Sequence, residues 1–249
     1  MKLRCLAFSA VFLSVLIFAG CSPALSVKLS PEYNVSMQFE SGTGAELSKT
    51  FTALTGQQMG TIQTGPAVKA MKAAGLTATG IMQNGSQFTL TTGPDKASGI
   101  LSGCPGAISV QSATPARTSA GDGPDVLSFT LSQETAQYII SLLPEETASY
   151  TELFMAPLFT GETMSPAEYE DLIAAVYGNQ LASELMYSRF TFSLSVPGSI
   201  TSVSVPAILN ASTSKNGGNV QIIIPLSSLL TLTQAQSILV FFDKTKYTN

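Results

Sequence analysis

The chain has 249 residues, of which 45% are hydrophobic and 11% are charged, and its formal net charge is −4. This apolar content supports a buried core and excludes a disordered stalk, and the length fits one large domain or two small ones. A mildly acidic chain with few cations offers no basic patch for phosphate backbones, so no nucleic-acid partner is expected.

Histidine is absent from the sequence. It is the usual proton carrier near neutral pH, the base that activates serine and cysteine nucleophiles, and a principal zinc ligand. Ser-His-Asp hydrolases, Cys-His proteases and His-ligated zinc peptidases are therefore excluded. No phosphate-binding loop, dinucleotide fingerprint or EF-hand loop is present, and residues 121–125 are too short for a calcium loop. We predict neither a cofactor nor a metal.

The amino-terminal residues predict an export signal. Lys2 and Arg4 form a basic start, residues 6–19 form an apolar run, and Ala19-Gly20 precede Cys21. The run is too short to cross a bilayer comfortably as a helix, which takes ~20 residues. The basic start and the small residues fit a signal that is removed. One alternative is an ordinary secretory signal whose cleavage site happens to precede a cysteine.

The stretch Phe18-Ala19-Gly20-Cys21 resembles the lipobox of bacterial lipoproteins, with Phe18 where leucine is usual. The resemblance implies cleavage before Cys21, a diacylglyceryl thioether on its sulfur and an acyl chain such as palmitate on its amine. Stable anchoring takes about two chains, each contributing ~0.8 kcal/mol per buried CH₂. Loss of Lys2 and Arg4 with the signal would take the net charge of the mature chain to −6.

The same resemblance bears on location. Ser22 stands where an aspartate would mark retention at the inner membrane. By analogy with that sorting rule, the outer membrane is favoured over the outer leaflet of the inner membrane, with an extracytoplasmic body. Because Cys5 would leave with the signal and Cys21 would carry lipid, only Cys104 remains, and no intramolecular disulfide is expected. Cys104 is interpreted as a buried apolar residue, with a catalytic thiol as the alternative.

The first part of the mature chain predicts strands, short helices and a hairpin. Apolar residues alternate over residues 22–39, which is typical of a strand with one buried face; Pro31 places it at an edge or splits it in two. Helical spacing follows at 46–58 and 66–75. Within 77–92, Asn84-Gly85 is a strong hairpin signal. A short strand is expected at Ile108 and Val110, and the turn-rich stretch 113–125 predicts an exposed loop or a weak subdomain boundary.

The middle of the chain predicts the main helices. Residues 126–131 should form a strand that leads into a helix over 132–143. Ser165, Pro166 and Glu168 have the spacing of a capping box with proline at the first helical position. Apolar residues then recur at helical spacing, so one long helix is expected over 166–187, laid across the sheet, with Gly178 as a bending or close-packing point.

The remaining residues predict mainly strands. Strand segments are expected at 190–196, 200–208, 220–224 and 238–242, with turns at Pro197-Gly198 and Asn216-Gly217-Gly218 and a short helix or turn over 225–232. This order of turns and strands over 188–243 resembles the LppM-type lipoprotein domain and carries no functional residue. We predict an α+β fold with a mostly antiparallel sheet covered on one side by a few helices.

Three groups of residues suggest chemistry, and each also has a structural explanation. Glu145-Glu146 and Glu168-Glu170-Asp171 could supply paired carboxylates for acid-base work on glycosidic bonds, or be solvated helix charges. Ser212 to Lys215 matches the Ser-x-x-Lys of penicillin-binding enzymes, but lies next to a turn without the accompanying motifs. The third group of residues could line a carbohydrate or apolar pocket or belong to the core: Tyr150, Phe154, Phe159, Tyr169 and Tyr177.

These observations lead to one main hypothesis and one alternative. The main hypothesis is an envelope lipoprotein, anchored through Cys21, that binds a protein, lipid or glycan partner or has a structural role without catalysis. The alternative is a carboxylate-based hydrolase that acts on envelope glycan. The alternative requires two acidic side chains facing one cleft, about 5–10 Å apart.

Overall fold

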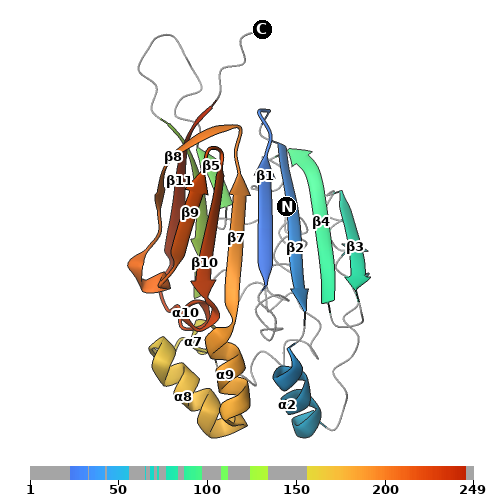
Figure 1. Ribbon diagram of the computed structural model, residues 1–249, viewed down its shortest axis with the longest axis vertical. Coiled ribbons are helices and arrows are strands. Elements are labelled where there is room, and N and C mark those ends of the chain that lie inside the picture. Colours follow the sequence, from blue (N-terminus) through green and yellow to red (C-terminus); the bar gives the residue numbers. More distant parts are fainter. Residues whose placement is uncertain are drawn as a thin grey trace.

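The computed structural model contains two β-sheets and a group of helices at one end (Figure 1). The predicted α+β class with a mostly antiparallel sheet is confirmed, and helices pack against that sheet. The structure describes residues 23–32, 34–42, 44–55, 65, 68–69, 72, 77–83, 87–96, 108–111, 124–133 and 156–244.

The larger sheet has seven strands in the order β3-β4-β2-β1-β7-β10-β9. Its neighbours are antiparallel except for β1 and β7, which run parallel and join the early strands to the late ones. The strand bounds are β1 Ala24–Leu29, β2 Asn34–Gly42, β3 Ala78–Gln83, β4 Gln87–Lys96, β7 Arg189–Ser195, β9 Ser212–Asn216 and β10 Asn219–Pro225.

Two turn predictions can be compared with this sheet. The strand expected over 22–39 is split in two around Pro31, because β1 ends at Leu29 and β2 begins at Asn34. Strands β3 and β4 pair antiparallel from Gln83 and Gln87 outward, so the hairpin predicted around Asn84-Gly85 is confirmed, although its turn residues lie outside the described ranges.

A second sheet of four antiparallel strands, in the order β5-β6-β11-β8, packs against the larger one. The rings of Phe129 on β6 and Phe192 on β7 stack with centroids 5.0 Å apart and 9° between their planes. The sequence predicted these strands but not their separation into a sheet of their own. Their bounds are β5 Ile108–Gln111, β6 Asp125–Leu131, β8 Gly198–Ser204 and β11 Gln236–Lys244.

The late strands alternate between the two sheets, and two predicted turns hold the crossover together. The chain leaves β7 through Pro197-Gly198 and enters β8, while Gly217-Gly218 connects β9 to β10. The N–H of Val196 donates to the Gly218 carbonyl (2.8 Å), and the N–H of Ile200 donates to that of Gly217 (2.9 Å). A Cβ on Gly218 would lie 2.4 Å from the Gly198 carbonyl oxygen, so only glycine permits this approach.

The helices gather at one end of the larger sheet (Figure 1). The capping box is confirmed: the N–H of Glu168 donates to the Ser165 hydroxyl, and that of Ser165 donates to the Glu168 carboxylate. The single helix expected over 166–187 is wrong, because Gly178, with φ of 94°, divides it in two. The bounds are α2 Ala45–Thr55, α7 Pro157–Thr160, α8 Pro166–Tyr177, α9 Asn179–Tyr187 and α10 Leu226–Leu230, with a 3-10 turn η1 at Ala207–Leu209.

One side chain of α9 caps a helix that is distant in sequence. The Glu184 carboxylate accepts the backbone N–H groups of Glu46 (2.9 Å) and Leu47 (3.2 Å) in the first turn of α2. The first N–H groups of a helix lack internal partners and attract negative charge. This contact therefore ties α2 to the late part of the chain.

Several predictions fall on residues outside the described ranges. They include the signal with Cys21, the thiol of Cys104, the pair Glu145-Glu146, the helix expected at 132–143 beyond Gln133, most of 66–75, and residues 113–123 of the predicted boundary. Within the described residues, no helix is both long enough and apolar enough to cross a membrane.

Candidate functional site

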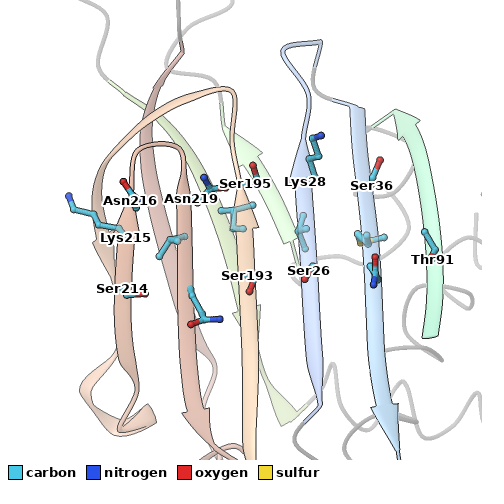
Figure 2. A pocket seen from close by; sticks show the side chains of 16 residues that line it. Ser26, Lys28, Ser36, Thr91, Ser193, Ser195, Ser214, Lys215, Asn216 and Asn219 are labelled. Atoms are coloured by element: carbon cyan, nitrogen blue, oxygen red, sulfur yellow. The ribbon is translucent and has the colours of Figure 1, made fainter. Parts of the chain in front are cut away.

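The outer face of the larger sheet, which points away from the smaller sheet, carries an open trough of about 580 Å³. Strands β9, β10, β7, β1, β2 and β4 form its floor (Figure 2). Along each of β1, β2, β7 and β10 the side chains alternate between a buried inner position and an outer one, as a half-buried strand requires. Together with residues of β4 and of the exposed edge strand β9, these outer positions give the trough its polar lining: Ser26, Lys28, Ser36, Gln38, Thr91, Ser193, Ser195, Ser214, Asn216, Asn219 and Gln221.

Strand register aligns six of these side chains in one row across the sheet, here called row one. Each member is the Cα partner of the next on the adjacent strand. Adjacent members are therefore separated by about one strand spacing, ~4.8 Å. Row one consists of Ser214, Gln221, Ser193, Ser26, Gln38 and Thr91.

A second row, row two, lies two residues further along each strand and contains the cation of the trough. It consists of Asn216, Asn219, Ser195, Lys28 and Ser36. Lys28 is exposed, with Ser195 and Ser36 as its partners on the flanking strands. Figure 2 shows this side chain rising from β1 between the serines of β7 and β2.

The other lysine that lines the trough does not add to its charge. Lys215 pairs with the inward-facing Val220, and its ammonium group donates to the Thr201 carbonyl at 2.8 Å. Figure 2 shows it directed away from the remaining labelled side chains. Among the described lining residues, Lys28 is therefore the one charged group that faces into the trough.

The chemistry of the two rows favours a ligand with many hydroxyl groups. Serine and threonine hydroxyls and the amides of asparagine and glutamine both donate and accept hydrogen bonds, as sugar hydroxyls do. An apolar ligand would remove these groups from water without replacing their hydrogen bonds, which is unfavourable. A polyanion would require more than one cation.

The predicted carboxylate cluster lies on α8, away from the trough. Glu168 is engaged in the cap, and hydrogen bonds from the backbone and hydroxyl of Ser165 lower its pKa. Asp171 is exposed and Glu170 half-buried on the same helix. In the described part of the chain, these residues do not form a pair facing one cleft.

The other sequence candidates also have structural roles where they are described. Ser212 and Lys215 lie on β9, whereas Ser-x-x-Lys chemistry needs a helix start. Tyr169 is 1% exposed in the core and Tyr177 packs against that core, so the core interpretation is confirmed for both. Burial raises the pKa of each phenol. The side chains of Tyr150, Phe154 and Phe159 lie outside the described set.

Sequence reasoning identified the strands of the trough but not the trough. The alternation over residues 22–39 and 190–196 was interpreted only for its apolar, buried positions, and nothing was inferred from the polar residues between them. The available signal was their chemistry: the outward positions hold small hydroxyls and amides, with few of the charges usual on an exposed sheet face. Recognising the rows required the register between strands that are far apart in sequence.

Comparisons with known proteins add one distant likeness. No protein family and no curated protein matches the chain. Among solved structures, the chain is similar to the NMR structure of the folded domain of LppM from Mycobacterium tuberculosis, with 9% sequence identity, a TM-score of 0.36 and 92% of each chain covered. This neighbour is a domain of the LppM type, the type that the order of turns and strands over residues 188–243 resembles.

Proposed function

We propose that this protein is a non-catalytic lipoprotein of the bacterial envelope, anchored through Cys21, whose trough binds a hydroxyl-rich glycan. The anchor is inferred from the lipobox resemblance of Phe18 to Cys21. The binding role depends on one observation, the two polar rows on the outer face of the larger sheet. A repeating glycan could contact several strands at once, because the rows present equivalent groups at each strand.

A non-catalytic role is preferred because the trough lacks the groups that glycoside hydrolysis uses. Such enzymes place two carboxylates on either side of the scissile bond. The described lining residues are hydroxyl, amide, aliphatic, methionine and lysine side chains. Glu40 lies on β2 beside the trough, where its carboxylate accepts from the Gln38 amide at 2.6 Å.

The glycan proposal can be tested by substituting row one. Ser26→Ala, Ser193→Ala and Gln221→Ala together remove three hydrogen-bonding groups at ~1 kcal/mol each, so we expect roughly a hundredfold weaker binding. The assay is co-sedimentation with purified peptidoglycan sacculi, followed by calorimetry with N-acetylglucosamine oligomers.

The matched control removes hydroxyls outside the trough. Thr130 and Ser237 form a hydroxyl pair 2.9 Å apart across β6 and β11 of the smaller sheet. Alanine at both positions should leave glycan binding unchanged. Equal binding by the row-one variant and the wild type, or the absence of binding by both, would disprove the glycan proposal.

The anchor has a separate test. Mass spectrometry of protein extracted from membranes should find residue 21 at the amino terminus with acyl chains attached. Cys21→Ala should accumulate as the unprocessed precursor. Full processing and continued membrane attachment of Cys21→Ala would contradict the proposed anchor without affecting the glycan proposal.

A further inference from the structure

Helix α9 presents an exposed face without charge. Asn179, Gln180, Ser183, Met186 and Tyr187 are its exposed residues. Tyr187 is 70% and Met186 39% exposed, although most large apolar side chains of the described chain are buried. The single charged residue of this helix, Glu184, directs its carboxylate to the first turn of α2.

The exposed side chains of α9 are not needed to pack the helix against the protein. Leu181 and Leu185 are buried and provide the contact of α9 with the core. Single exposed apolar residues are common on protein surfaces. The face of α9 therefore needs a second observation to indicate an occupant.

That observation is the position at which the anchored end of the chain enters the fold. The Pro23 carbonyl accepts the N–H of Thr191 at 2.9 Å, which holds the start of β1 beside the start of β7. Cys21 lies two residues before Pro23, and two residues span at most ~7 Å. Tyr187 lies four residues before Thr191. Figure 1 shows α9 leading directly into this end of β7.

We propose that the face of α9 rests on the lipid surface beside the acylated Cys21, with Tyr187 and Met186 inserted among the headgroups. This inference depends on the lipid anchor proposed above. Tyrosine is favoured at the membrane interface because its ring is apolar and its hydroxyl stays hydrated. Methionine adapts to irregular apolar surroundings. An uncharged face also avoids the cost of desolvating ions.

The contact would fix the orientation of the whole body. A tether of two residues leaves little freedom, so the lipid and the α9 face would together form two attachment points. The end of the larger sheet that carries α9 and the start of β1 would then face the membrane. The far end, with the Gly217-Gly218 turn, would point away from it.

The experiment uses the absence of tryptophan from the sequence. Tyr187→Trp in the full chain places the single tryptophan of the protein in the α9 face, where its emission can be excited apart from that of the tyrosines. Ser199→Trp introduces the control at an exposed position of β8, just after the crossover at the far end of the sheet. Both proteins are purified with their lipid and reconstituted into phosphatidylcholine vesicles, with and without bromine on the acyl chains.

We expect brominated lipid to remove most of the emission of Tyr187→Trp and to leave that of Ser199→Trp unchanged. Acylated protein with equal emission in both vesicle types would disprove the inference and leave the anchor intact. A blue shift without bromine quenching would also disprove it, because a protein surface would then cover the face. If residue 21 carries no lipid by mass spectrometry, the anchor and this inference both fail.

Discussion

The two faces of the larger sheet are built from the same strands but have different roles. Phe190, Phe192 and Leu194 of β7 are at most 2% exposed, whereas Ser193 and Ser195, which alternate with them, open onto the trough. The inner side chains supply the hydrophobic free energy of folding. The outer ones add little to it and are available for binding. The effect of a substitution should therefore depend on which face it changes.

The largest difference is expected at two adjacent positions of β7. Phe192→Ala removes a fully buried ring that stacks on Phe129, and comparable truncations lower the free energy of unfolding by about 3–5 kcal/mol. Ser193→Ala should change it by less than about 0.5 kcal/mol. Urea unfolding followed by circular dichroism measures both, and equal effects would contradict the division between the faces.

A smaller effect is expected for the cap between α9 and α2. Glu184→Ala leaves two N–H groups of the first turn of α2 without the carboxylate, which should lower the free energy of unfolding by about 1 kcal/mol. Asp171→Asn, an exposed change on α8, is the control and should have almost no effect. Equal stability of Glu184→Ala and the wild type would show that water replaces the carboxylate without cost.

Lys28 tests the same division of the faces, because it is the one charged group among the described lining residues that faces into the trough. Lys28→Met should leave the stability within about 0.5 kcal/mol of wild type. It should weaken glycan binding less than tenfold, since the row of neutral groups supplies most of the hydrogen bonds. Calorimetry at low and high salt measures this. A hundredfold loss that salt reproduces in the wild type would instead indicate an anionic ligand.

The smallest effect concerns the exposed cap of α8. Hydrogen bonds from Ser165 lower the pKa of Glu168 in the folded protein. The stability that this carboxylate contributes is therefore present at neutral pH and is lost as the pH falls from the ordinary glutamate pKa, ~4.3, through the lowered value. Glu168→Gln should flatten that part of the curve of unfolding free energy against pH. An unchanged curve would contradict the assignment.

Local structure was largely predictable from local sequence. The capping box from Ser165 to Glu168, the break at Pro31 and the turn at Gly217-Gly218 depend on backbone preferences of a few adjacent residues, and all are present. Alternating apolar residues likewise identified the strands and their buried sides. Gly178 was predicted only as a bending or close-packing point and not as the end of a helix, because the helical spacing of apolar residues continues across it.

The residue pattern alone was enough to establish the α+β class, most strand positions and the exclusion of histidine-dependent chemistry. The partition of the strands into two sheets, the rows that form the trough and the contact of Glu184 with α2 became visible only in the folded chain. The physical reason is that pairing between β1 and β7 joins residues more than 160 positions apart. Their register depends on the packing of the whole core, which no local pattern in the sequence encodes.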